Sequence, residues 1–139
     1  LVRMVESEGL ETRVRFIPKV HLSELPAYTR NAYVGFQVLQ DINYNHYSAS
    51  SNKLFEYIMA HVPVISCNFP EIKKVVEGEE VGVAVDASDP KVLADAVNRL
   101  VSNEPLRDLY SENCRAAKKK YNWDLEKEKL LDVYKNLDE

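Results

Sequence analysis

Residues 33–66 read YVGFQVLQDINYNHYSASSNKLFEYIMAHVPVIS, and this stretch decides the fold. Residues 33–39 are almost continuously apolar, which is typical of a strand buried on both faces. A polar loop follows, then a helical pattern over residues 51–61, and then a second apolar run at residues 63–66. A strand, a helix and a strand in this order predict two parallel strands joined by a crossover helix.

The same alternation continues on both sides of this unit. Two further apolar runs, at residues 14–17 and 81–85, predict one strand before it and one after it. Helical patterns occupy residues 22–32 and 70–77, between the predicted strands. Four strands separated by helices favour a parallel sheet with helices on both of its faces.

The C-terminal third is predicted to be helical throughout. Ser88 and Asp89, followed by Pro90, stand where a helix cap and a first-turn proline are expected; Pro105 begins the next helix, and Asn122 caps the last. Residues 1–9 have the pattern of the end of an earlier helix. The whole of residues 1–139 is therefore expected to be a single α/β domain, because no repeat, low-complexity segment or linker interrupts it.

Composition narrows the class of protein. The chain has 139 residues with a net charge of −4 and 45% hydrophobic residues, enough for a real core and no support for nucleic-acid binding. Cys67 and Cys114 lack metal-ligand spacing, so they are interpreted as reduced thiols of a cytosolic protein. No apolar run approaches the roughly 20 residues of a membrane span, and no signal peptide is recognised. Because the chain begins with Leu1 rather than methionine, we expect the true N-terminus to lie upstream.

The start of the predicted helix at residues 51–61 has the features of an anion site. In parallel sheets, ligands bind beyond the carboxyl ends of the strands, where helices begin. Here a loop rich in Asn, Tyr and Ser leads into a helix that starts around Ser50 to Asn52. The unpaired backbone N–H groups of a helix start suit a pyrophosphate, and Lys53 in the first turn would add a positive charge.

Glu56 is the second feature of this helix, as the only acidic residue between Ile42 and Pro70. It is surrounded in the sequence by apolar residues, so the helix is expected to be largely buried and Glu56 to be buried with it. Glu56 shares a helix face with Asn52 and leans toward the N-terminus, where it could accept two hydrogen bonds from a ribose diol. An ion pair between Glu56 and Lys53 on a partly exposed helix face, worth a few tenths of a kcal/mol, explains the presence of Glu56 equally well.

Several of these segments resemble a known family. Residues 52–60, NKLFEYIMA, and the strand after them are similar to the donor-site helix and next strand of the group 1 glycosyltransferases. The NKLFEY stretch resembles the bacterial surface-polysaccharide branch in particular. Further matches follow in the same order: residues 10–16, 23–25, 69–72 and 81–86. The resemblance implies a Rossmann-like fold, the C-terminal, donor-binding domain of a GT-B enzyme, for the whole chain.

The family pattern assigns roles to individual residues. Glu56 matches the second glutamate of the E-x7-E motif, which holds the nucleotide ribose, while the first glutamate falls on Ser48, a departure that affects contacts to the sugar. Ala49 and its neighbours match a glycine-rich helix start that faces the phosphates. His61 replaces a common glycine, and we expect it to adopt a left-handed backbone. The expected substrate-binding residues are Ser48, Ser50, Ser51, Asn52, Lys53 and Glu56.

The resemblance also implies what lies outside the chain. The family's domain normally begins with two more strands, whose connecting loop carries an Arg/Lys pair that grips the phosphates, and an N-terminal acceptor domain precedes it. We therefore assign no catalytic residue here and expect the fragment alone to be inactive. Unpaired strand edges left by the two absent strands favour self-association of the fragment.

The function implied by the resemblance is transfer of a hexose from a nucleotide-diphosphate sugar to a glycan or lipid-linked acceptor, in cell-surface polysaccharide synthesis. The expected enzyme is retaining, uses neither cofactor nor metal, and works in the cytoplasm or at the inner membrane face. The runner-up is a nucleotide-sugar epimerase of the same architecture, for which Asp41 and His46 are candidate catalytic groups. A non-enzymatic flavodoxin-like binding module is the third alternative. The four glycines of the chain cannot form the Gly-x-Gly-x-x-Gly loop of a dehydrogenase.

Overall fold

A three-stranded parallel sheet forms the centre of the molecule, which is described here by a computed structural model covering residues 1–136. The strands are β1 (Gly35–Gln37), β2 (Val64–Cys67) and β3 (Gly82–Val85), and β2 lies in the middle. Gly35 pairs with Val64, and Val64 pairs with Gly82, so the three strands start at one level. The parallel sheet predicted from the sequence is thus confirmed.

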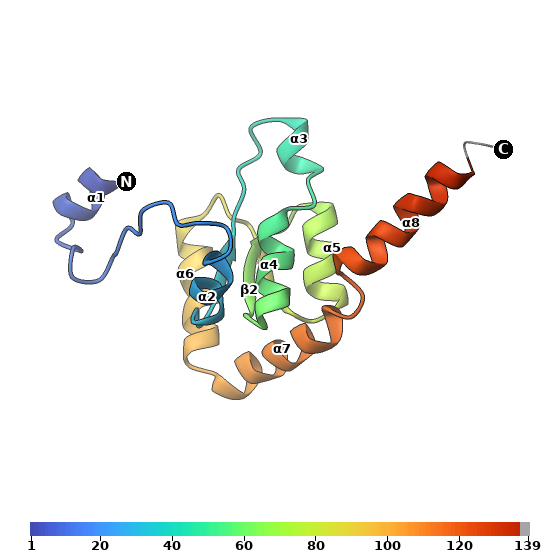
Figure 1. Cartoon of the computed structure of the whole chain (residues 1–139). Coiled ribbons are helices and arrows are strands. Elements are labelled where there is room, and N and C mark those ends of the chain that lie inside the picture. The colour runs from blue at the N-terminus through green and yellow to red at the C-terminus, as the bar shows by residue number, and fades with distance from the viewer. Residues whose placement is uncertain (137–139) are drawn as a thin grey trace.

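Helices cover both faces of this sheet (Figure 1). α4 (Asn52–Ala60) and α5 (Pro70–Gly78) pack on one face, and α6 (Pro90–Val101) packs on the other. α7 (Glu104–Ala117) runs beneath the sheet and contacts α4 and α6. α2 (Leu25–Arg30) packs beside α4. Both faces are therefore covered, as a sheet with apolar residues on both sides requires.

Two hydrophobic clusters hold these layers together. Leu54 and Ile58 of α4 join Val64 of β2 in the larger cluster, between the sheet and α4, α5 and α7. Ile65, the next residue of β2, packs instead against Leu100 of α6 in the smaller cluster. Consecutive strand residues point to opposite faces, so Val64 and Ile65 place one side chain in each cluster.

The helix boundaries follow local sequence signals. Asp89 caps α6 by accepting a hydrogen bond from the backbone N–H of Lys91 at 2.8 Å. Asn122 caps α8 (Trp123–Lys135) in the same way, by accepting from the N–H of Leu125 at 3.1 Å. His61 ends α4 with a left-handed backbone, φ 61° and ψ 34°. All three were predicted from the sequence.

Both cysteines are buried and unpaired in the larger cluster. Burial raises the pKa of the Cys114 thiol to about 12, so this thiol stays protonated at neutral pH. The Cys114 Sγ faces the carbonyl oxygen of Val62 at 3.7 Å. Both side chains serve as small apolar core residues, in agreement with the interpretation of reduced thiols.

The strand predicted at residues 14–17 is wrong. This segment is irregular and exposed, with Phe16 50% and Ile17 53% exposed. A strand needs a neighbour to pair its backbone groups, and within residues 1–136 β1 pairs only with β2. The predicted strand at residues 33–39 is shortened to Gly35–Gln37 for the same reason, and Phe36 is 45% exposed rather than buried.

Three helices lie outside the packed layers (Figure 1). α1 (Val2–Ser7) and α8 project from opposite sides of the body, and neither contains a buried residue. α3 (Tyr44–Tyr47) is a single turn within the loop above the sheet, where the sequence predicted no helix. The side chain of Asn43 caps α3 by accepting from the N–H of His46 at 2.9 Å, a local signal that the sequence analysis missed.

Candidate functional site

The first turn of α4 begins at the edge of the sheet where the strands end. β1 stops at Gln37, and the chain then forms the loop with α3 before entering α4 from above (Figure 1). Ser51 is the N-cap, with an extended backbone, and its side chain makes no capping hydrogen bond. The backbone N–H groups of Asn52 and Lys53 therefore have no side-chain cap, and the two residues are exposed, as an anion site at a helix start requires.

Residues 50–53 of the predicted substrate-binding set lie together at this helix start, and Ser48 does not. Ser50, Asn52 and Lys53 are exposed next to the half-buried Ser51. Ser48 lies further back, at the end of α3, where its hydroxyl donates to the carbonyl oxygen of Tyr44 at 2.8 Å. Ser48 is thus tied to its own loop, although its oxygen still has lone pairs with which to accept a hydrogen bond.

Glu56 is exposed, and the expectation that it is buried was wrong. α4 buries Leu54 and Ile58, and Glu56 lies about 200° around the helix axis from each of them. Phe55 and Tyr57 are only partly buried, and Met59 is 45% exposed, so the helix is half-buried instead of largely buried.

The ion pair with Lys53, which was the alternative explanation of Glu56, is not formed either. In the described part of the chain, no hydrogen bond or salt bridge involves the Glu56 carboxylate. Its two oxygens are therefore available to a ligand. Glu56 is four positions after Asn52, so it lies about one turn further along α4 than the first N–H groups and on the same face.

A cavity of about 670 Å³ opens beside this face of α4. It is lined by α4, by α2 along its length together with Leu22, and by the turn between α7 and α8. Asn52 and Glu56 line the cavity together. Its other lining residues are mainly apolar, including Leu22, Leu25, Phe55, Met59, Tyr121 and Trp123.

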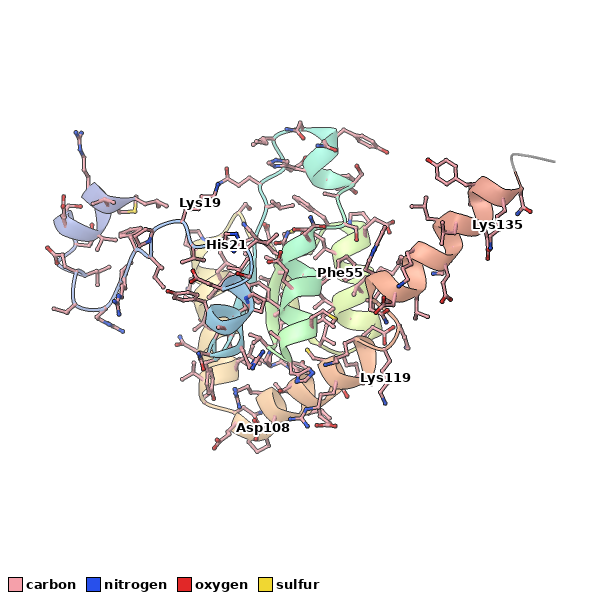
Figure 2. All side chains as sticks on the ribbon, in the orientation of Figure 1. Lys19, His21, Phe55, Asp108, Lys119 and Lys135 are labelled. Atoms are coloured by element: carbon pink, nitrogen blue, oxygen red, sulfur yellow. The ribbon has the colours of Figure 1, made fainter. Side chains whose placement is uncertain are left out.

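The turn between α7 and α8 is tied to the end of α5 by hydrogen bonds and packs against α4 through one aromatic ring. The Tyr121 hydroxyl donates to Oε1 of Glu79 at 3.2 Å, and Nζ of Lys120 donates to Oε2 of the same carboxylate at 2.6 Å. Burial and the nearby Glu79 charge raise the pKa of Tyr121, so it remains a neutral hydroxyl. Its ring lies 5.5 Å from that of Phe55, on the side of α4 that faces the start of α8 (Figure 2).

Sequence reasoning missed this part of the site. Phe55 and Tyr121 are far apart in the chain, and no local pattern near Trp123 distinguishes it from an ordinary exposed residue at a helix start. The available signal was compositional, because Trp123 is the single tryptophan of the chain.

Two buried polar side chains lie near the carboxyl ends of the strands. Gln37 and Ser66 are register partners on β1 and β2, and they are 2% and 0% exposed. Neither Nε2 of Gln37 nor Oγ of Ser66 has a hydrogen-bond partner within the described residues. Buried polar atoms without partners are rare, and these two stand close to the sheet edge at which ligands bind in such folds.

The two candidate groups of the epimerase alternative, Asp41 and His46, lie in the loop that precedes α4. His46 is engaged within its own loop, with Nδ1 3.1 Å from the carbonyl oxygen of Gln40. Between residues 1 and 136, no hydrogen bond or ion pair connects Asp41 to His46.

Over residues 1–136, no group of three or more His, Cys, Asp or Glu side chains is placed to hold a metal ion. None of the described helices combines the length and hydropathy needed to span a bilayer.

Comparison with known proteins finds a matching sequence family and several similar proteins. Residues 1–103 match the sequence family described as "Glycosyl transferases group 1". The chain is 31% identical over 84 residues to a phosphatidyl-myo-inositol mannosyltransferase of Mycobacterium leprae, covering 60% of this chain and 22% of that protein. It is 27% identical over 134 residues to a D-inositol 3-phosphate glycosyltransferase of Salinispora tropica, covering 96% of this chain and 27% of the relative.

A solved structure shares the arrangement of helices and strands. Sucrose-phosphate synthase from Thermosynechococcus elongatus superposes with a TM-score of 0.84 at 22% identity, covering 98% of this chain and 33% of that one. The likeness includes nearly all of the described elements, and it concerns the fold alone. The chain thus spans between about a fifth and a third of the length of the proteins that it resembles.

Proposed function

Because this chain belongs to the group 1 glycosyltransferases, we propose that it is the donor-binding half of an enzyme that transfers a hexose from a nucleotide-diphosphate sugar. The α/β arrangement is that of a partial GT-B domain. The acceptor of the full-length protein is a glycan or a lipid-linked sugar, bound by a domain outside these residues. The NKLFEY helix supports a role in cell-surface polysaccharide synthesis.

One observation carries the proposal: the uncapped start of α4 and the unpaired Glu56 carboxylate are on one helix face, beside the same cavity. The helix start and Lys53 would bind the pyrophosphate, with Ser50, Ser51 and Asn52 next to it. Glu56, one turn below, would accept hydrogen bonds from the ribose hydroxyls. Ser48, in the loop that leads into α4, is the residue of the set proposed to approach the sugar.

The chemistry of sugar transfer fits such a site. As the bond from the sugar to the diphosphate breaks, negative charge grows on the leaving phosphate oxygens. Fixed N–H dipoles and a nearby cation stabilise that charge without needing to reorganise. The first turn of α4 and Lys53 are this chain's contribution, and neither requires a metal ion or cofactor. We propose that the enzyme works in the cytoplasm, at the inner face of the membrane when its acceptor is a lipid.

The decisive experiment measures nucleotide binding by the variant Glu56→Gln. Losing a charged hydrogen-bond partner of the ribose should weaken binding of UDP or GDP by about 1–3 kcal/mol in calorimetry. Glu128→Gln is the matched control, because Glu128 is an exposed acid on α8 that does not line the cavity. Equal affinities of wild type and Glu56→Gln would overturn the assignment to the ribose.

A further inference from the structure

We propose that Gln37 and Ser66 are positioning residues for the diphosphate of the donor, and that they act through one buried water molecule beneath the first turn of α4. The inference rests on the proposed function, because it takes the diphosphate at the start of α4 from that proposal. It adds two residues to those that the sequence assigned to substrate binding.

The position of Gln37 follows from a close contact between β1 and α4. A Cβ added to Gly35 would collide with the ring of Tyr57, so this side of β1 faces α4. Gln37, two residues further along β1, points to the same side and lies roughly 7 Å nearer the carboxyl edge of the sheet. α4 begins at that edge (Figure 1), and at about 1.5 Å per residue the same distance back from Tyr57 reaches Asn52 or Lys53. Gln37 therefore lies level with the first turn of α4.

Ser66 lies beside Gln37 on the same face of the sheet. The two residues are register partners, and partners on adjacent strands are about 4.8 Å apart with their side chains on one face. Val64, two residues before Ser66 on β2, belongs to the hydrophobic cluster that contains Leu54 of α4. Both polar side chains are therefore enclosed between the sheet and the first turns of α4.

The missing hydrogen bonds of these two side chains stand out in the structure. Within residues 1–136, three buried side-chain nitrogen or oxygen atoms have no hydrogen-bond partner, and two of them are Nε2 of Gln37 and Oγ of Ser66. The third, Nε of Arg107, belongs to a guanidinium that pairs with Asp108 through another nitrogen. The two register partners are thus the place where unpaired polar atoms gather.

This arrangement lowers the stability of the unliganded chain. A buried polar atom without a partner carries its full desolvation cost, whereas an apolar side chain of the same shape carries none. Gln37 and Ser66 are 2% and 0% exposed, so bulk water does not offset that cost. We infer that binding, rather than folding, accounts for a polar pair at this position.

A single water molecule is the ligand that suits the pair. The two side chains are covered too completely to touch a diphosphate directly, but a buried water needs only two to four polar partners. Nε2 of Gln37 and the hydroxyl of Ser66 can both donate to the water oxygen, and the water can then donate to a phosphate oxygen. Every donor in this chain is aimed at the anion, as are the uncapped N–H groups of Asn52 and Lys53.

The test compares binding with stability in the 139-residue chain. Inorganic pyrophosphate and UDP are each titrated by calorimetry into wild type, Gln37→Met and Ser66→Ala, and urea unfolding is measured without ligand. We expect each variant to bind both ligands about tenfold more weakly, the factor for one lost hydrogen bond. We expect the urea midpoint of each variant to equal or exceed that of wild type, because an unpaired polar atom is removed.

Two further variants serve as controls. Ile65→Val changes the residue next to Ser66, but Ile65 packs in the cluster with α6, so this variant should lower the urea midpoint and leave both affinities unchanged. Ser66→Thr keeps the hydroxyl and should retain the affinity for both ligands. Glu56→Gln, at the proposed ribose position, should weaken UDP and leave pyrophosphate unaffected.

The possible failures are distinguishable. If Gln37→Met and Ser66→Ala bind both ligands as tightly as wild type, the positioning role is overturned and the donor site stands. The role is also overturned if the urea midpoint falls together with affinity in these variants and in Ile65→Val, because the pair then only supports the sheet. Weakened binding of UDP without weakened binding of pyrophosphate would overturn the placement at the phosphates. If wild type binds neither ligand, the proposed donor site fails and this inference fails with it.

Discussion

Nε2 of His61 lies 3.1 Å from Nζ of Lys118, a contact that joins the end of α4 to the end of α7 across 57 residues. An ammonium group can only donate, so the imidazole nitrogen that faces it must accept and His61 must be neutral. Burial lowers the pKa of His61, and Lys118, Arg115 and Arg30 lower it further, while Glu112 opposes them. The carbonyl oxygen of His61 also accepts from the Ser111 hydroxyl at 2.8 Å, so this corner fixes the lower end of the proposed donor helix.

The chain should therefore lose stability as the pH falls. The pKa of His61 is below 6.5 in the folded state and near 6.5 in the unfolded state, so the unfolded state binds more protons between these values. The contribution of neutral His61 is fully present above pH 6.5 and is lost as the pH falls through 6.5 toward the folded pKa. Urea unfolding at pH 7.5 and 5.5 measures this effect.

The variant His61→Asn isolates the contribution of His61 to this pH dependence, because asparagine tolerates the left-handed backbone at this position and does not titrate in this range. His61→Asn should show a smaller loss of unfolding free energy between the two pH values than wild type. His21→Asn, at an exposed histidine, serves as the control and should keep the wild-type loss. An unchanged pH dependence in His61→Asn would contradict the assignment.

Gly82 lies close against the backbone of β2. A Cβ added to Gly82 would collide with the carbonyl oxygen of Val64 on β2, whereas a Cβ on Gly78 would meet nothing within 4 Å. Gly82→Ala should therefore destabilise the chain by about 1–3 kcal/mol, the range for overpacking, and Gly78→Ala should be nearly neutral. Chemical denaturation of the two variants compares them directly, and equal midpoints would show that β2 and β3 can separate without cost.

Residues 1–139 should bind a nucleotide without transferring sugar. They span between about a fifth and a third of the proteins they resemble, and the proposed acceptor wall and phosphate-gripping cations lie outside them. Incubation with nucleotide sugars and acceptors, followed by mass spectrometry, should detect no glycosylated product. Measurable transfer by this chain alone would show that it carries a complete active site.

The free edge of β1 should cause self-association. β1 has no strand on its outer side within the described residues, and Tyr33, Phe36 and Val38 beside that edge are 44%, 45% and 41% exposed. An unpaired apolar edge is a template for pairing with a second chain. Light scattering at micromolar concentration should give a mass above 15.9 kDa.

The variant Phe36→Lys should shift this equilibrium toward the monomer, because a charge at a strand edge opposes pairing. Val101→Lys adds the same charge at an exposed position of α6, away from the edge, and should leave the assembly unchanged. A clean monomer of the wild-type chain would rule out self-association.

Local patterns in the sequence determined most elements of the fold. Helix caps, first-turn prolines and the left-handed end of α4 act through hydrogen bonds and backbone preferences within a few residues, so Asp89, Asn122 and His61 could be assigned by inspection. The α/β class followed from the order of apolar runs, because a run buried on both faces requires helices on both sides.

Tertiary structure decided the remainder, because it depends on which distant segments meet. Residues 14–17 have the composition of a strand but lack a strand beside them to pair with, and the same absence exposes Phe36. Glu56 is exposed because α4 buries only the face containing Leu54 and Ile58, and the sequence does not specify how wide that face is. The lining of the cavity includes the turn that carries Trp123, and this turn is anchored to Glu79 through Tyr121, a contact between residues 42 apart that no local pattern encodes.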